Sequence, residues 1–347
     1  AEAYPDLATI YSRLGNYAQE TAYLEKIKER NINYPEIQQA TARNIRQRQP
    51  HLSAEFDYRD EDGRDQAIDI NQKYAGLALQ LAPTPEQLFN VFAGRSEYGD
   101  SSSTTQIKSN AIRGSYEHSF SRWLLSRLSI GGEDFDTDAT SYFLFDLKLE
   151  FRFEENLSIY GAFRQIPVTD TIEAIREGIS RTEVESGVAI DLAPRWFLGF
   201  EAQFHNYNDE NDGKEFDIWS TYHLFGETSK LDLKYRFTRI ENRIDNEDPL
   251  PAADGGGQSS LVYWSPGDYW KNLFSASYRY ELWPTGKLQS GTGHVQAEYG
   301  IGYESGNYLV QVLNCDILLE INPMFLVKGT FTSEWSDDYE GYRFYTG

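Results

Sequence analysis

The stretch 141–153, SYFLFDLKLEFRF, alternates apolar and polar side chains, and it decides the fold class of the chain. From residue 143 onward every second residue is Phe or Leu, and four charged residues lie between them: Asp146, Lys148, Glu150 and Arg152. A period of two indicates a β-strand with one apolar and one polar face. Such strands occur in soluble sandwiches and in outer-membrane barrels, so the question is which face meets water.

Similar alternating stretches recur after residue 50, and we count about 16 strands. They include HLSAEFDYR (51–59), WFLGFEAQF (196–204), KLDLKYRF (230–237), NLFSASYRYEL (272–282), HVQAEYGIGYE (294–304) and FLVKGTFTSEW (325–335). The links between them are short at 154–156 and 304–307, and long and polar near 207–214, 242–260 and 284–293. Short turns at one rim and long loops at the other are typical of an outer-membrane barrel.

The two faces of these strands indicate where the water lies. The apolar faces are rich in Tyr, Trp and Phe near strand ends, as an interfacial girdle requires, and the polar faces mix acidic and basic residues that a packed interior would not tolerate unpaired. We therefore predict a mainly β fold, a transmembrane antiparallel β-barrel of about 16 strands over residues 50–347. A soluble multi-sheet protein is the alternative. The predicted lumen side chains, chosen by facing, are Asp146, Lys148, Glu150, Arg152, Glu201, Asp232, Lys234, Arg236, Glu298 and Glu304.

Composition narrows the class of protein. The net charge is -22 and the mean hydropathy is -0.59, and no apolar run is long enough for a transmembrane helix. One cysteine, Cys315, excludes a disulfide framework and a thiolate metal site. An acidic surface of this size repels nucleic acid. The chain begins at Ala1 with neither a Met nor a signal peptide, so we expect a mature or trimmed product.

Residues 1–49 have a helical period instead. Apolar residues at 7, 10, 11, 14, 17, 24 and 27 lie on helical spacing around a turn at Gly15-Asn16, and residues 1–34 match the tetratricopeptide repeat period. Ala8 and Glu20 depart from that repeat, and we expect Glu20 to loosen the helix pair or to face solvent. A third helix is predicted over 34–49. We therefore predict periplasmic tetratricopeptide-like helices at 1–49, with further repeats before Ala1; an ordinary helical hairpin is the alternative.

Three segments carry a resemblance to a known family: Arg48–Gly63, Arg164–Gly178 and Tyr263–Tyr280. Together with the repeat ahead of them, they resemble the carboxy-terminal part of synthase-dependent exopolysaccharide export proteins. That group includes the cellulose-synthase-operon protein C type, the poly-N-acetylglucosamine porins and the Pel-type exporter. The resemblance implies a 16-stranded barrel in the outer membrane of a Gram-negative bacterium, behind periplasmic repeats. It also implies a polysaccharide cargo, contact with the lipid bilayer, and periplasmic or inner-membrane synthase components on the helical region.

The segment 167–179 interrupts the β pattern. Thr169 or Asp170 is placed to cap a short helix with Ile172, Ala174 and Ile175 on one side. In the family the corresponding segment lies at a barrel mouth or folds toward the lumen, so we expect it to narrow or gate the pore. An ordinary surface loop is the alternative. The candidate gating or constricting residues are Asp170, Glu173, Arg176 and Glu177.

The acidic excess suggests the cargo. A lumen biased toward carboxylates repels polyanions and concentrates cations, which favours a partly deacetylated, cationic amino-sugar polymer. The alternative is that most acidic residues lie in external loops. Four aromatic residues of the third family segment are candidates for stacking on sugar rings or for anchoring at the membrane interface: Tyr263, Trp264, Tyr269 and Trp270.

No residue pattern indicates an enzyme. The five histidines are scattered without ligand spacing, and no nucleophile, phosphate-loop or dinucleotide motif occurs, so we predict no catalytic residue, no metal site and no cofactor. A barrel hydrolase acting on lipid A or phospholipid is the remaining enzymatic alternative. The predicted function is an outer-membrane pore that exports an exopolysaccharide. The second interpretation is a barrel sleeve or anchor for an extracellular protein fibre or a cytochrome.

Overall fold

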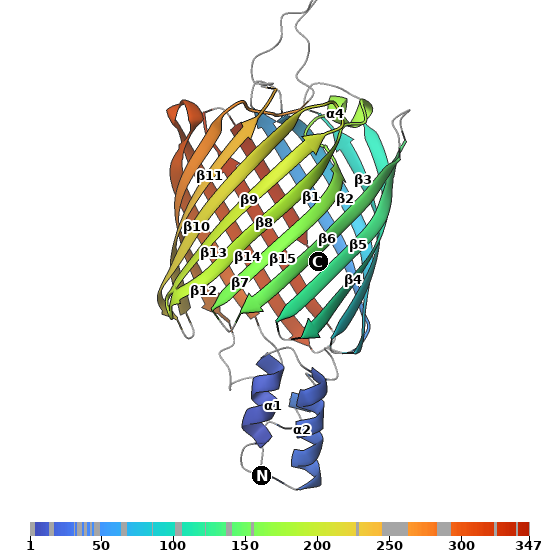
Figure 1. The fold of residues 1–347 in the computed structure, drawn as a ribbon, viewed down its shortest axis with the longest axis vertical. Helices are drawn as coiled ribbons and strands as arrows, with labels where there is room; N and C mark the ends of the chain where they lie inside the picture. Colours follow the sequence, from blue (N-terminus) through green and yellow to red (C-terminus); the bar gives the residue numbers. More distant parts are fainter. Residues whose placement is uncertain are drawn as a thin grey trace, which may run out of the picture.

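The chain forms a closed barrel of antiparallel strands, β1 to β16, in this computed structural model (Figure 1). Each strand pairs with its neighbours in sequence, and β1 pairs with β16 to close the barrel. The prediction of an antiparallel barrel of about 16 strands is therefore confirmed. The structure describes residues 4–13, 17–30, 32, 37, 40–41, 44, 49–63, 68–84, 86–100, 106–121, 123–136, 141–153, 156–226, 229–244, 263–282, 293–322, 325–337 and 339–346.

The strands follow one another with little intervening structure. The first eight are β1 (His51–Gly63), β2 (Ile68–Thr84), β3 (Gln87–Gly99), β4 (Ile107–Ser121), β5 (Leu124–Phe135), β6 (Tyr142–Phe153), β7 (Leu157–Pro167) and β8 (Ser180–Ala193). The second eight are β9 (Trp196–Tyr207), β10 (Asp212–Gly226), β11 (Ser229–Asn242), β12 (Tyr269–Glu281), β13 (Gly293–Glu304), β14 (Tyr308–Asn322), β15 (Phe325–Trp335) and β16 (Tyr339–Thr346). A short helix, α4 (Ile172–Arg176), lies between β7 and β8, and a 3-10 turn, η2 (Ser305–Asn307), between β13 and β14.

Alternation along each strand separates an outer from an inner face. The outer face exposes large apolar side chains from strands all round the barrel, such as Leu77 on β2, Ile112 on β4, Phe200 on β9 and Phe274 on β12. The residues between them are shielded from bulk solvent by the barrel itself. Exposed apolar surface on this scale is foreign to a water-soluble monomer and matches the lipid-facing band of a membrane barrel.

The two rims of the barrel differ, as the sequence predicted. We call the rim next to the N-terminal helices the helix rim, and the rim at which α4 lies the far rim (Figure 1). Most links at the helix rim are tight, as between β8 and β9 at 194–195, whereas the long β11–β12 link begins and ends at the far rim. Two expectations are wrong: strand order makes the long β12–β13 link (282–292) begin and end at the helix rim, and it places the short link 305–307 at the far rim. Most of 242–260 and 284–293 is outside the described residues.

The N-terminal region contains two described helices, α1 (Tyr4–Arg13) and α2 (Tyr17–Glu29), which lie below the barrel in Figure 1. They share a small buried cluster of Ala8, Leu24, Ile27 and Ala40. Glu20 does not face solvent, contrary to expectation: it is fully buried and its carboxylate accepts a hydrogen bond of 2.9 Å from the Asn44 amide. A buried carboxylate needs such a partner. The described residues around 37–44 are helical, and the rest of the predicted third helix lies outside the described residues.

No helix in the described part of the chain is long and apolar enough to cross a membrane.

Candidate functional site: the lumen and its far mouth

Charged side chains line the inner wall of β6 to β8 as an ion-pair ladder. Arg164 of β7 reaches two buried carboxylates on β8, with Nη2 at 2.6 Å from Glu185 and Nη1 at 3.7 Å from Glu183. Its Nε lies 3.9 Å from Asp146 on β6, and Arg181 adds a contact of 2.6 Å to Glu183. Side chains of opposite sign from neighbouring strands therefore compensate one another, which makes it possible to hold them inside the barrel.

The ladder continues on β9 to β11. Arg236 Nε donates to Asp217 at 2.7 Å, and the Thr238 hydroxyl donates to the same carboxylate at 2.6 Å. Tyr160 of β7 reaches across β8 and donates its hydroxyl to Glu201 of β9. That reach is possible because Gly187 lies between them, and a Cβ at Gly187 would overlap the Tyr160 ring.

Two further pairs cross the wall of β11 to β15. Lys234 of β11 bonds Glu298 of β13, and Lys271 of β12 bonds both oxygens of Glu334 on β15 at 2.9 and 3.0 Å. A third pair closes the barrel seam, where Arg343 of β16 binds Asp57 of β1. The inner wall is thus polar and charged, as a hydrated passage requires.

A cavity of about 870 Å³ occupies the barrel on the side of β9 to β16. Its wall mixes charged and polar side chains with apolar ones such as Phe197, Leu273 and Val312. Its lining includes Glu201, Glu215, Trp219, Lys234, Arg236, Thr238, Lys271, Ser275, Glu298, Asn314, Thr332 and Glu334, and toward the far rim Trp264 and Tyr269.

The β7–β8 link folds inward at the far rim and fills the other side of the mouth. Thr171 is the N-cap of α4, since its hydroxyl accepts a 3.0 Å hydrogen bond from the Ala174 amide; the cap is neither Thr169 nor Asp170. The backbone of Asp69 on β2 donates to the Asp170 carbonyl at 3.2 Å, so the link is tied to a strand five places away. Arg59 of β1 adds a 3.5 Å contact to the Asp170 carboxylate.

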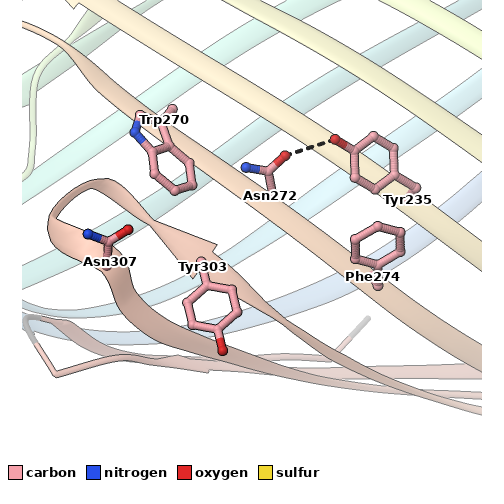
Figure 2. Close-up of a pocket in the computed structure, with 6 residues that line it drawn as sticks. All are labelled: Tyr235, Trp270, Asn272, Phe274, Tyr303 and Asn307. Carbon is pink, nitrogen blue, oxygen red and sulfur yellow. Dashed lines mark hydrogen bonds between the residues drawn. The ribbon is translucent and has the colours of Figure 1, made fainter.

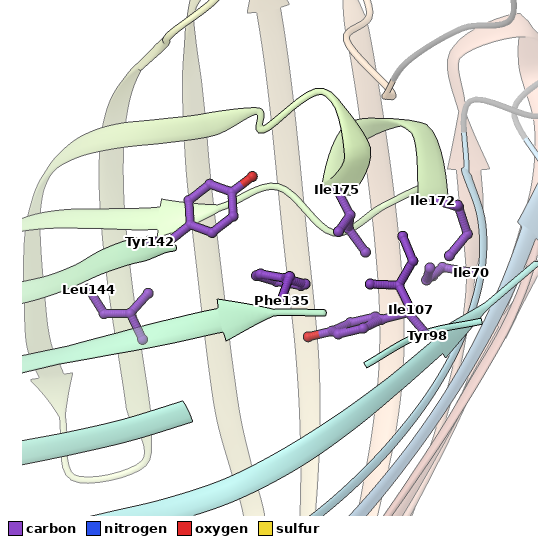
Figure 3. Close-up of a cluster of buried hydrophobic side chains, with 8 residues drawn as sticks. All are labelled: Ile70, Tyr98, Ile107, Phe135, Tyr142, Leu144, Ile172 and Ile175. Carbon is purple, nitrogen blue, oxygen red and sulfur yellow. The ribbon is translucent and has the colours of Figure 1, made fainter. Parts of the chain in front are cut away.

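The apolar side of α4 is inserted among inner-wall residues. Ile172 and Ile175 are fully buried in a cluster to which five strands contribute (Figure 3). The wall partners in this cluster are Ile70 of β2, Tyr98 of β3, Ile107 of β4, Phe135 of β5, and Tyr142 and Leu144 of β6. These inner-wall side chains form the seat of the helix, and burial of both apolar surfaces stabilises the contact.

A second inward segment packs against the back of α4. Tyr263, from the link between β11 and β12, is buried with Val168, Ala174, Ile179 and Tyr207, and its ring stacks on Tyr207 at 4.7 Å. The Tyr263 hydroxyl donates to Asp209 at 2.8 Å and accepts from the Asn211 amide at 3.2 Å.

Burial raises the pKa of the Tyr263 hydroxyl above its ordinary value, and the hydrogen bond to Asp209 raises it further. The hydroxyl therefore stays protonated as a donor to Asp209 at neutral pH. It fixes the second segment at the mouth, beside α4.

The β7–β8 link with α4 and the segment around Tyr263 together cover one part of the far mouth. The α4 cluster covers the inner wall from β2 to β6, whereas the cavity follows β9 to β16 and reaches Trp264 and Tyr269. The open part of the lumen is therefore displaced to one side of the barrel axis.

The predicted pore-lining residues fall into three groups. Glu201, Lys234, Arg236 and Glu298 line the cavity. Asp146 lies in the Arg164 ladder, Lys148 lies over the Tyr160 ring at 4.0 Å, Glu150 binds Arg152 at 2.6 Å, and Asp232 binds His223 at 2.6 Å. Glu304 is different: it is fully buried in the wall, where it accepts a 2.6 Å hydrogen bond from the Tyr269 hydroxyl.

The charged gate candidates are not the groups that occupy the mouth. Glu173 and Arg176 face solvent and form a 3.8 Å ion pair with each other, and the backbone N–H of Glu177 caps α4. Asp170 anchors the link through Arg59 and Asp69. The side chains of α4 that pack against the inner wall are Ile172 and Ile175, which the sequence placed on one side of the helix without assigning them a role.

The four candidate stacking aromatics separate in the structure. Tyr263 is buried, so no sugar can reach its ring. Trp264 and Tyr269 line the cavity and form an edge-on pair at 5.0 Å. Trp270 points to the outer face, where it lines a hollow with Tyr235, Phe274 and Tyr303 (Figure 2). Tyr269 and Trp270 are neighbours in a strand, and neighbours point to opposite faces.

Most negative charge of the lumen is paired with a base, so the expectation of a strongly acidic passage needs refining. Lys234, Arg236 and Lys271 each bind a carboxylate. Within the described residues, the cavity carboxylates that lack an ion pair are Glu201 and Glu215. The acidic bias of the cavity is therefore local.

Comparison with solved structures identifies the fold. A structure described as a bacterial polysaccharide outer membrane secretin superposes with a TM-score of 0.63 at 13% identity, over 84% of this chain and 96% of that chain. OccK3 (OpdO) of Pseudomonas aeruginosa gives a TM-score of 0.45 at 11% identity over 86% of this chain and 94% of its own. OprD of the same organism gives 0.39 at 12%, over 86% and 92%.

The chain therefore has the fold of outer-membrane barrels. No family model matches it, and neither does any curated protein. Among the described residues no group of three or more His, Cys, Asp or Glu side chains is arranged to hold a metal ion.

Proposed function

We propose that the protein is an outer-membrane pore of a Gram-negative bacterium through which an exopolysaccharide leaves the cell, with the helical region in the periplasm. The observation that carries the proposal is the charge-lined cavity inside a barrel whose outer face is apolar. The barrel supplies a hydrated path, and polymerisation upstream supplies the push. Synthase components are the partners proposed for the helices α1 and α2.

The arrangement of the far mouth supports a thin, flexible cargo. The side of the mouth at β2 to β6 is filled by the α4 cluster, so the open path is off-centre. A single polysaccharide strand fits such a path. A sleeve around a protein fibre or a cytochrome needs the full bore of the barrel, and this geometry therefore disfavours it.

The cargo we favour is a cationic amino-sugar polymer. Paired charges on most of the wall neither attract nor repel a chain strongly, whereas the unpaired Glu201 and Glu215 favour positive groups where they lie. The charges of the cavity wall therefore favour cationic groups near Glu201 and Glu215 and not along the whole path.

The decisive experiment is deletion of the gene and complementation with the full chain, with sugar analysis of the polymer on the cell surface. We expect surface polymer to be lost on deletion, to accumulate in the periplasm, and to return on complementation. Unchanged surface polymer in the deletion strain, or a deletion phenotype confined to uptake of small solutes, would contradict export. Loss of a neutral or anionic polymer would contradict the cationic cargo alone.

A further inference from the structure

One aromatic ring lies open on the cavity wall. Trp219 of β10 is paired with Gly199 of β9, and a Cβ at Gly199 would overlap the Trp219 ring. The ring therefore lies flat against the backbone of β9, and its other face is turned to the cavity, whose wall it helps to form.

Two other inner-wall rings, Tyr160 and Tyr74, are covered by neighbouring groups. Lys148 Nζ lies 4.0 Å from the centre of the Tyr160 ring, whose opposite face is against Gly187. Tyr74 of β2 lies over Gly76 and Gly94 and stacks with Phe92 at 5.6 Å. Among the cavity tryptophans, Trp264 is paired edge-on with Tyr269 at 5.0 Å, whereas Trp219 lies near inner-face carboxylates of β9 and β10, so we consider Trp219 as the ligand contact.

Charges around Trp219 are acidic beyond what the bases compensate. Glu201 lies on β9 two residues from Gly199, and Glu215 lies on β10 four residues from Trp219, on the same inner face. Arg236, opposite Trp219 in the register, is already held by Asp217 at 2.7 Å. A polymer that packs on the Trp219 face therefore also passes Glu201 and, farther along β10, Glu215, and neither carboxylate has an ion pair within the described residues.

We propose that Trp219, Glu201 and Glu215 form a subsite that holds consecutive amino-sugar units of the passing polymer. The apolar face of one sugar ring packs on the indole, and the ammonium groups of that unit and its neighbours lie close to Glu201 and Glu215. The inference rests on the proposed function and names the residues that would contact the exported polymer. It places sugar contact at Trp219 of β10, whereas the sequence placed it at the third family segment.

The test is isothermal titration of the full chain in detergent with a hexamer of β-1,4-linked glucosamine. The Trp219→Ala variant is expected to bind the hexamer about tenfold more weakly, as loss of one stacked and partly cationic contact predicts. Gly199→Ala is expected to weaken binding as well, because the ring loses its seat. Trp270→Ala is the matched control: it removes an indole from the outer face and leaves affinity unchanged.

The carboxylates are tested with the N-acetylated hexamer, which has the same ring but no charge. Glu201→Gln with Glu215→Gln is expected to remove the preference for glucosamine and to leave binding of the acetylated hexamer unchanged. Wild-type affinity in Trp219→Ala, or no binding of either hexamer by the wild type, would overturn the subsite. If the hexamer does not bind while the deletion strain still loses surface polymer, the subsite fails and export stands.

Discussion

Replacing both Ile172 and Ile175 by aspartate is expected to open the far mouth and raise the single-channel conductance several-fold. Both side chains are fully buried in the α4 cluster. Burying an unpaired carboxylate there costs well over about 2 kcal/mol for each side chain. This cost is expected to exceed what the Asp170 contacts with Asp69 and Arg59 and the burial of Ala174 contribute to a helix of five residues, so the segment leaves the wall. The measurement is conductance of the purified protein in planar bilayers.

Matched changes on the solvent side of α4 are the control. Glu173→Ala and Arg176→Ala remove only an exposed ion pair, which contributes less than about 1 kcal/mol. Their conductance is expected to equal that of the wild type. If the double aspartate variant conducts as the wild type does while still forming a heat-resistant barrel, then α4 is not the obstruction.

A charge on the outer face is expected to destabilise the barrel in lipid. Phe200 lies in the middle of β9, is 44% exposed, and is flanked by Val188 and Ile218 on the neighbouring strands. Phe200→Arg should lower the free energy of unfolding from vesicles by about 2–4 kcal/mol, the cost of an arginine on the lipid face at mid-depth. Guanidinium titration of the vesicle-inserted protein measures it.

The same charge on the inner face is the comparison. Thr332 of β15 lines the cavity, so an arginine there stays hydrated. Thr332→Arg should cost less than about 1 kcal/mol. Equal losses for the two variants would mean that the outer face does not meet lipid.

The barrel itself was predictable because a two-residue period is a local signal. Stretches such as 141–153 alternate apolar and polar residues, and counting these stretches gave the approximate number of strands. Facing was predictable for the same reason, which is why Glu201, Lys234, Arg236 and Glu298 were identified. Glu304 shows the limit of this reasoning. Its position in the alternation predicts which face of the strand it lies on, whereas its burial depends on Tyr269 of the neighbouring strand β12.

The contents of the mouth were not predictable, because they depend on contacts between distant strands. The sequence gives α4 an apolar side, but only the barrel places Ile70, Ile107 and Phe135 where that side can bury. The gating prediction selected charged residues of the β7–β8 link because a sequence shows which residues are charged but not which are buried. The same holds for Glu20, whose partner Asn44 is far along the chain.

The aromatic contacts illustrate a third limit. A cluster of aromatics in sequence suggested one stacking surface, yet Tyr263, Tyr269 and Trp270 point into three different environments. Trp219 carried no such signal, because its seat on Gly199 comes from pairing of β9 with β10. The only available hint was an inward-facing tryptophan on a strand otherwise lined by polar groups.

Thiol labelling along β12 tests the inside-out arrangement most directly. In a Cys315→Ser background, single cysteines replace Leu273, Phe274, Ser275 and Ala276 in turn, and the protein in liposomes is treated with a charged, membrane-impermeant maleimide. Positions 273 and 275 should react, because Leu273 and Ser275 line the cavity, whereas 274 and 276 should react only after the liposomes are dissolved. Reaction at 274 and 276 in intact liposomes, with 273 and 275 protected, would contradict a hydrated lumen inside an apolar shell.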